Sequence, residues 1–176
     1  MRHAWMVVLL LLGRVAHADE PRWPIRLNVA MPFGYTAGHE ALHGFTWGFR
    51  AAATVHPARD GLAVGGYAEM LLDADTDALD SFGVTAAYPL IRHDDCCFEW
   101  RAGLSAAVRT SDSDNDKRGV FGVSTHVAMP FYLYELRVGV RFEATEHRGS
   151  LSAESVLIDV DLLAIAGIFG LAGGIK

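Results

Sequence analysis

A short histidine motif is the first feature of the sequence that could support chemistry. The segment His39-Glu40-Ala41-Leu42-His43 matches the H-E-x-x-H pattern of zinc metalloproteases, in which both histidines bind the metal and the glutamate activates a water molecule. That arrangement requires a helix, so that the two histidines face the same way. Gly38 and Gly44 bound the motif here and leave room for about one helical turn. We interpret the motif as a solvated loop, with zinc catalysis and incidental metal binding as the alternatives.

Two runs of alternating aspartates are the second candidate for ligand chemistry. The runs consist of Asp73, Asp75 and Asp77 and of Asp112, Asp114 and Asp116. Alternating carboxylates in a loop can surround a hard cation such as Ca²⁺. Neither run continues to the glycine and the distant glutamate that an EF-hand loop requires. We therefore expect solubilising loops, with a specific cation site as the alternative.

A serine and a histidine two residues apart could form part of a hydrolytic site. Ser124 and His126 lie on the same polar face of a strand-like segment, and a histidine can activate a serine as a nucleophile. The sequence identifies no acidic residue that would orient the histidine. We favour a hydrogen-bonded pair inside the fold, with a catalytic pair as the alternative.

The N-terminus carries the features of an export signal. After a basic start, Met6–Leu12 forms a short apolar core, and Ala16-His17-Ala18 supplies the small-x-small pattern of a cleavage site. The apolar run is shorter than the roughly 20 residues that a membrane-spanning helix needs. We expect residues 1–18 to be a cleaved signal peptide and residues 19–176 to form one exported domain.

The charge and cysteine content of the predicted mature chain limit which partners it can bind and which disulfides it can form. Without Arg2 and Arg14 the chain keeps 13 basic and 21 acidic residues, a net charge of about −8. This acidic balance argues against a nucleic-acid partner. Cys96 and Cys97 are adjacent and cannot close the long loop of an ordinary structural disulfide, so their redox state stays open. No cofactor is predicted.

From Ile25 onward, apolar and polar residues alternate with a period of two, which predicts strands with one apolar face. Eight such segments follow one another, at residues 25–33, 45–55, 62–72, 81–88, 98–109, 121–131, 134–143 and 156–162. The usual segment length, about 11 residues, is what a tilted strand needs to cross a bilayer. The alternation blurs near residues 164–167, where we expect a bulge or a bend.

The predicted connections differ in length and composition. Those after the second, fourth and sixth segments are short, at residues 56–61, 92–96 and near Leu133. Those after the first, third, fifth and seventh segments are longer and polar, at residues 36–40, 73–77, 111–116 and 146–150. With an even number of strands, the longer, mostly acidic loops all lie on the side opposite to the termini.

Aromatic residues on the apolar face gather at the strand ends and leave the middles aliphatic. One predicted rim contains Phe33, Tyr35, Phe45, Trp47, Phe82, Phe121 and Phe142, and the other contains Tyr88, Phe98, Trp100, Phe131 and Tyr134. Two aromatic girdles around an aliphatic belt are typical of a wall embedded in a bilayer. A soluble barrel, with its apolar side chains inside, is the alternative.

The opposite face combines small residues with charges of both signs. Its predicted cations are Arg26, Arg50, Arg101, Arg109, Arg137 and Arg141, and its anions are Glu69, Glu99, Glu135, Glu143, Asp159 and Asp161. The bore of an eight-stranded barrel is just wide enough to be filled by side chains. Paired arginines and carboxylates beside glycines would fill it and neutralise one another.

In these strands, rims and loops the chain resembles the small eight-stranded outer-membrane β-barrels of Gram-negative bacteria. The resemblance extends from Ile25 to about Phe169, beyond which seven residues follow the aromatic. It implies an all-β protein, an eight-stranded antiparallel up-and-down transmembrane barrel, in the outer membrane of the cell. It also implies a monomer in contact with membrane lipid and lipopolysaccharide, whose bridging divalent cations the acidic loops could share.

The function expected from this resemblance is non-enzymatic: a structural or surface-interaction role through the acidic outer loops. A lipid-modifying enzyme is the first alternative, since some such barrels are lipid A deacylases with a histidine and a serine two residues apart. In those enzymes the histidine comes first and the pair faces lipid, whereas Ser124 precedes His126 here and both are predicted to point inward. A soluble exported barrel that binds an apolar ligand is the second alternative.

Overall fold

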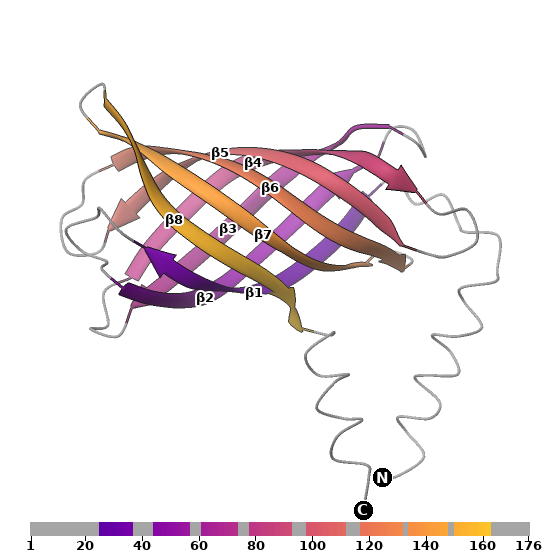
Figure 1. The fold of residues 1–176 in the computed structure, drawn as a ribbon, viewed down its shortest axis with the longest axis horizontal. Helices are drawn as coiled ribbons and strands as arrows, with labels where there is room; N and C mark the ends of the chain where they lie inside the picture. The colour runs from indigo at the N-terminus through magenta and orange to yellow at the C-terminus, as the bar shows by residue number, and fades with distance from the viewer. Residues whose placement is uncertain are drawn as a thin grey trace, which may run out of the picture.

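The computed structural model describes residues 25–36, 44–56, 61–73, 78–92, 98–111, 117–131, 134–147 and 150–162. They form eight strands: β1 (Ile25–Thr36), β2 (Gly44–Val55), β3 (Ala63–Asp73), β4 (Ala78–Arg92), β5 (Glu99–Ser111), β6 (Lys117–Phe131), β7 (Tyr134–His147) and β8 (Ser150–Asp161). Each strand pairs antiparallel with the next, and β1 pairs with β8, which closes the barrel of Figure 1. The predicted eight-stranded antiparallel up-and-down barrel is confirmed.

Two rims bound this barrel. The terminal rim is the end at which β1 begins with Ile25 and β8 ends with Asp161, and the loop rim is the end at which β1 stops at Thr36. The predicted signal peptide, residues 1–18, lies outside the described residues, as does the predicted bulge at residues 164–167. In the described segments no helix is long and apolar enough to cross a membrane.

The predicted difference in length between the two sets of connections is wrong. Residues 146–150 were predicted to form a long loop, but β7 continues to His147 and β8 begins at Ser150. By contrast, residues 56–62 separate β2 from β3, which makes a predicted short connection one of the longer ones. The reason is that backbone pairing continues where the side-chain alternation fades: Glu146 still pairs with Leu151 in the ladder.

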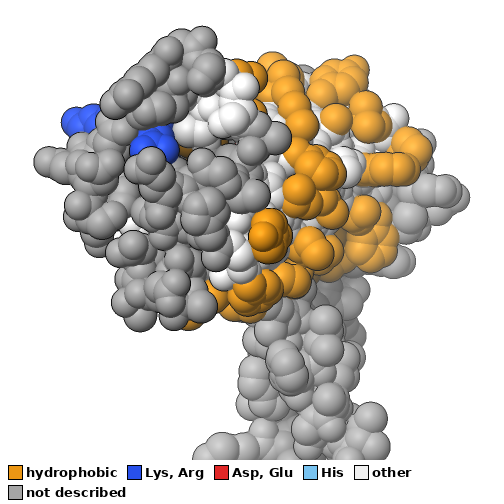
Figure 2. Space-filling view, turned by 60° about the vertical axis from the view of Figure 1, so that its left-hand side comes forward, with side chains coloured by type: hydrophobic (Ala, Val, Ile, Leu, Met, Phe, Trp, Pro, Cys, Tyr) orange, Lys and Arg blue, Asp and Glu red, His pale blue; other side chains and the backbone are white. Residues whose placement is uncertain are grey.

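The apolar face of the strands points outward. Large apolar side chains are exposed along the whole wall, and Phe82, Val84 and Leu104 each expose about two-thirds of their surface (66%, 64% and 64%). Figure 2 shows the resulting belt of hydrophobic side chains around the side of the barrel. The inward face instead buries charged and polar residues. This arrangement is the reverse of a soluble barrel, in which the apolar side chains fill the interior.

A bulge near the end of β4 interrupts this alternation. The pairing of β4 with β5 shifts between Pro89 and Ile91, and as a result Leu90 and Ile91 are both exposed. Proline lacks the N–H that a ladder needs and is therefore found at bulges. The bulge moves two successive apolar side chains to the outer surface at the terminal rim.

Each of the first seven strands has a glycine on its inward face: Gly34, Gly48, Gly65, Gly83, Gly103, Gly122 and Gly139. At Gly65 a Cβ atom would lie 1.9 Å from the carbonyl oxygen of Ala53 on β2, so no side chain fits without moving the backbone. Glycines at regular places around a barrel allow the strands to bend and the sheet to close. Gly66 faces outward, and a Cβ there would have its nearest neighbour at 3.6 Å.

We expect Gly65→Ala to lower the free energy of unfolding by about 1–3 kcal/mol, the usual cost of forcing extra volume into a packed site. Gly66→Ala is the matched control on the same strand and should change it by no more than about 0.5 kcal/mol. Urea unfolding of both variants in detergent micelles measures the difference. Equal effects of the two substitutions would contradict the close packing of β2 against β3.

Candidate functional site

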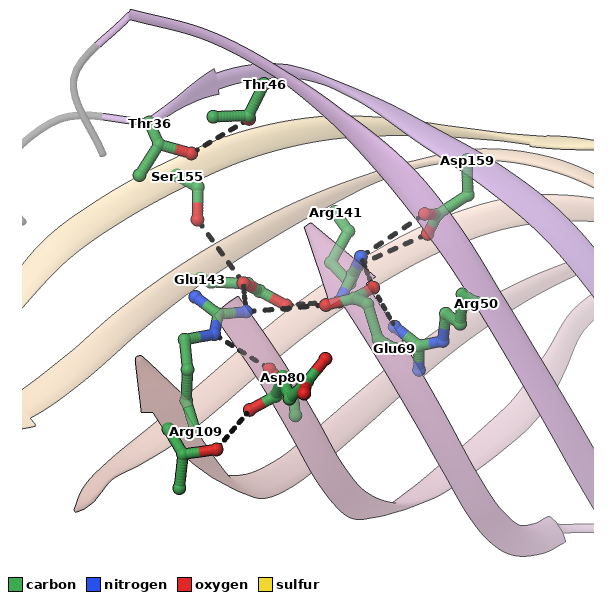
Figure 3. Close-up of polar contacts among 12 residues, drawn as sticks. Thr36, Thr46, Arg50, Glu69, Asp80, Arg109, Arg141, Glu143, Ser155 and Asp159 are labelled. Carbon is green, nitrogen blue, oxygen red and sulfur yellow. Dashed lines mark hydrogen bonds and ion pairs between the residues drawn. The ribbon is translucent and has the colours of Figure 1, made fainter. Parts of the chain in front are cut away.

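The lumen of the barrel contains two networks of buried charges. The Glu69 network lies toward the loop rim and consists of Arg50, Glu69, Arg109, Arg141, Glu143 and Asp159 (Figure 3). The Glu135 network lies toward the terminal rim and includes Arg26, Glu99, Arg101, Glu135 and Arg137. With Asp161, these are the twelve charged residues that the sequence predicted for the inward face.

Glu69 on β3 is the carboxylate that all three arginines of its network share. It accepts hydrogen bonds from Arg141 Nη1 at 3.3 Å and from Arg109 Nη2 at 3.4 Å, and Arg141 Nη2 contacts its second oxygen more closely still. Arg50 Nη1 lies farther off, 3.7 Å from Glu69 Oε2, as an ion pair. Three guanidinium groups from β2, β5 and β7 thus converge on one carboxylate from β3.

Glu143 and Asp159 complete the charge balance of the Glu69 network. Glu143 accepts a hydrogen bond from Arg109 Nη2 at 2.6 Å and contacts Arg141 Nη1. Asp159 on β8 accepts from Arg141 Nη2 at 3.3 Å. Three arginines therefore meet three carboxylates, which matters because an uncompensated charge in this environment costs several kcal/mol.

Glu135 on β7 is the centre of the second network. Its carboxylate accepts hydrogen bonds from Arg101 Nη1 and from Arg137 Nη2, each at 2.8 Å. Arg26 Nη1 and His56 Nε2 lie 3.8 and 3.9 Å from Glu135 Oε2, the oxygen that accepts from Arg101. The network links β1, β5 and β7 across the bore at the terminal rim.

A polar junction at the β1–β8 seam is a feature that the sequence did not predict. Among the described residues β1 pairs with β8 from Ala30 to Thr36, and nearer the terminal rim Leu27 pairs with Tyr134 of β7. The Tyr134 hydroxyl donates to Asp161 at 2.8 Å, and Asn28 Nδ2 donates to the same carboxylate at 2.9 Å. Tyr134 was predicted only as a rim aromatic, because period-two alternation does not show that its hydroxyl reaches the seam.

Ser124 and His126 both point into the lumen, as predicted. His126 is buried, and its Nε2 has no hydrogen-bond partner within the described part of the chain. Among the residues that the structure describes, no hydrogen bond joins Ser124 to His126, and no carboxylate is hydrogen-bonded to the imidazole. The geometry thus lacks the nucleophile–base contact that a catalytic pair requires, and neither side chain faces the outer wall.

The candidate metal ligands fall mostly outside the described residues. His39, Glu40 and His43 lie there, and so do Asp75, Asp77, Asp112, Asp114, Asp116 and the Cys96–Cys97 pair. Among the residues that the structure does describe, no group of three or more histidine, cysteine or acidic side chains could hold a metal ion. The zinc and calcium interpretations therefore stay predictions from the sequence.

Comparison with known proteins does not assign the chain to a family. No protein-family model matches the sequence, and no curated protein shows significant similarity to it. The evidence about function therefore comes from the charge networks in the lumen and from the apolar outer wall.

We expect Glu69→Gln to lower the free energy of unfolding by about 3–5 kcal/mol, since it removes one partner from a buried ion network and leaves its arginines uncompensated. Glu146→Gln, at an exposed position near the loop rim, is the control for loss of a carboxylate. An exposed ion pair contributes about 0–1 kcal/mol, so the control should change stability by no more than that. Urea unfolding in micelles compares the two variants, and a similar small effect of both would contradict the shared role of Glu69.

His56, just beyond the end of β2, gives a prediction about pH. Burial and the positive charge of Arg101 lower the pKa of His56 from about 6.5 to about 4, although Glu135 opposes the shift. Between these pH values the unfolded chain binds a proton that the folded chain does not, so folding stability falls as the pH decreases from about 6.5 to about 4. His56→Gln should remove this part of the pH dependence. The measurement is the difference in urea midpoint between the two proteins at pH 7 and at pH 4.5, and an identical difference at both would contradict the shift.

Proposed function

We propose that this chain is an outer-membrane β-barrel with a non-enzymatic, structural or surface-interaction role. The observation that carries the proposal is the inverted distribution of side chains, apolar outside and charged inside. Exposed apolar side chains occur on every strand, for example at Leu27, Phe49, Val64, Val84, Leu104, Val123, Val138 and Ile158. Soluble monomers rarely expose apolar patches larger than a few hundred Å², whereas a bilayer favours such a wall.

The aromatic residues on the wall support the same environment. Tyr35 and Phe45 pair with each other next to the loop rim and are both largely exposed. Tyr88, Phe98 and Trp100 are exposed toward the terminal rim. Aromatic side chains near both ends of a barrel favour the boundaries between lipid headgroups and hydrocarbon.

A polar group of the outer wall has its partner within the protein. The indole N–H of Trp100 on β5 donates a hydrogen bond to Thr125 Oγ1 on β6. In hydrocarbon no water is available to satisfy such groups, so internal pairing is required there. The contact therefore suits a wall in contact with lipid.

The filled lumen favours an anchor or scaffold over a channel. Buried arginines and carboxylates from most strands cross the bore in the two networks. A barrel of this size is just wide enough for its interior side chains. In this proposal the partners are membrane lipid and lipopolysaccharide, and a surface ligand would bind through the acidic connections at the loop rim.

Location is tested by fractionating cells that produce the full chain. We expect the protein in the outer-membrane fraction, retained after a carbonate wash and released by detergent. Unboiled, detergent-solubilised protein should migrate differently in gels from boiled protein, because the closed barrel resists detergent at room temperature. Release by carbonate alone would overturn the proposal in favour of a soluble exported barrel.

A matched pair of substitutions tests which solvent surrounds the wall. Leu104 lies in the middle of β5 and Leu151 lies at the loop-rim start of β8, and both are 64% exposed. In phospholipid bilayers, Leu104→Arg should lower the free energy of unfolding by about 2–4 kcal/mol and Leu151→Arg by about 0–1 kcal/mol, because the cost of arginine depends on depth. In water both substitutions would have small effects. Equal small effects in bilayers would contradict the membrane assignment.

A further inference from the structure

β8 ends about half-way along β1, short of the terminal rim. Its last residue, Asp161, pairs with Ala30, so residues 25–29 of β1 continue for five more residues toward that rim. With a rise of about 3.3 Å per residue and a tilt of about 40°, this continuation covers about 12 Å of the barrel height. Figure 1 shows the yellow end of β8 set back from the strand ends beside it. Since the apolar band of an outer-membrane barrel is about 25 Å tall, the chain leaves the wall inside that band.

The edge of β1 below this point is already paired within the barrel. Leu27 pairs with Tyr134 of β7. The Tyr134 hydroxyl accepts a hydrogen bond from the Val29 N–H at 3.0 Å and lies 3.2 Å from the Val29 carbonyl oxygen. A strand that continued β8 would have to displace these contacts. In hydrocarbon, the backbone groups of the residues that follow are therefore best satisfied within their own segment, as in a helix.

The residues that follow β8 in the sequence suit a helix in an apolar environment. No charged or hydrogen-bonding side chain occurs in residues 162–175. An apolar run of this length is more typical of a segment lying in or against a membrane than of a helix that spans it.

These residues would also give such a helix two different faces. Its small residues recur every four positions and share one face: Ala166, Gly170 and Gly174. Large apolar residues lie on the opposite face: Ile165, Ile168 and Ile175. Small residues on one face let a helix approach another surface closely inside a membrane.

The outer wall on both sides of the end of β8 offers an apolar surface for this face. Ile25 and Leu27 on β1 and Val138 on β7 each expose about half of their surface (48%, 47% and 48%). Val138 pairs with Val160, one residue before β8 ends. A segment that leaves the wall after Asp161 therefore meets apolar side chains on either side.

We propose that residues 163–175 form an apolar helix that packs, small face inward, on the outer wall below the end of β8, between β1 and β7. The inference rests on the proposed membrane location. A helix satisfies its own backbone groups at the depth where β8 stops. Its length of about 20 Å carries it from that depth to the terminal rim. Lys176, which follows, then lies among the lipid headgroups, as long basic side chains do at membrane boundaries.

The position of such a helix relative to β1 can be calculated. Leu27 lies three strand residues below Ala30, and Ala166 lies five residues beyond Asp161. Along the barrel axis these are descents of about 8 Å each, at 3.3 Å per residue of a tilted strand and 1.5 Å per residue of a helix. Ala166 on the small face is therefore level with Leu27.

Cysteine pairs test this position in phospholipid vesicles, using the full chain in a Cys96→Ser, Cys97→Ser background. We expect Leu27→Cys and Ala166→Cys to form a disulfide on mild oxidation. Ala164→Cys is the matched control, because in a helix residue 164 faces away from the wall. Its pair with Leu27→Cys should stay largely reduced.

Two other outcomes of this experiment would overturn the proposal. A strand that continued β8 in register would place Ala164 opposite Leu27, so a disulfide of Leu27→Cys with Ala164→Cys in place of Ala166→Cys would exclude the helix. No disulfide for either pair would exclude packing on this part of the wall.

A second variant tests which face of the helix packs. Gly170→Leu adds bulk to the small face and should lower the yield of the disulfide between Leu27→Cys and Ala166→Cys several-fold. Ile168→Leu, on the opposite face, should leave the yield unchanged. Equal yields with the two substitutions would overturn the inward orientation of the small face.

A carbonate wash of the same vesicles separates this inference from the membrane assignment. If the wash releases the protein, the membrane location and the docked helix both fail. If the protein stays in the membrane and the disulfide does not form, only the docked helix fails. The difference in gel migration between unboiled and boiled protein shows that the barrel of each variant is closed.

Discussion

Arginines and carboxylates share the narrow bore of a closed barrel whose outer wall is apolar, and their mutual neutralisation is the constraint on which the rest of the structure depends. Glu69 and Glu135 each serve more than one guanidinium, so each network joins three or more strands. A buried ion without its partner would cost several kcal/mol. The strands are therefore held at positions where these side chains meet, in addition to their backbone ladders.

The size of the inward side chains follows from the same constraint. Long arginines and glutamates can cross the bore only if other inward positions stay small. Gly139 illustrates this, because a Cβ there would lie 2.4 Å from the Cβ of His126 on the paired strand. At Gly122 the same atom would lie 2.4 Å from Ser105 Oγ. Glycines thus leave volume for the charged groups and also let the strands curve.

Although arginines and carboxylates are equal in number in the Glu69 network, the carboxylates are shared unevenly among the arginines. Arg141 is in contact with three carboxylates, whereas Arg50 has one distant ion pair and an aromatic ring. This uneven sharing leaves nitrogen atoms of Arg50 without a hydrogen-bond partner among the described residues. On the outer wall, the indole N–H of Trp100 has a partner within the protein, Thr125. Among the described residues, the buried charged groups are therefore concentrated in the lumen and the exposed apolar side chains on the wall.

The sequence by itself determined the number of strands, their antiparallel order and the set of charged residues that share the polar face. These features follow from local sequence, because side chains alternate between the two faces of a strand. Which residues share a face is therefore the same whichever strand pairs with it. The aromatic rims also predicted that the polar face is the inner one, which the structure confirms. Only the tertiary structure decided where β7 ends and β8 begins, and how Tyr134 reaches the seam. It also decided which arginine meets which carboxylate: Glu69 and Arg141 are 72 residues apart in the chain. Such contacts depend on register and closure between distant strands, which no local pattern of residues specifies.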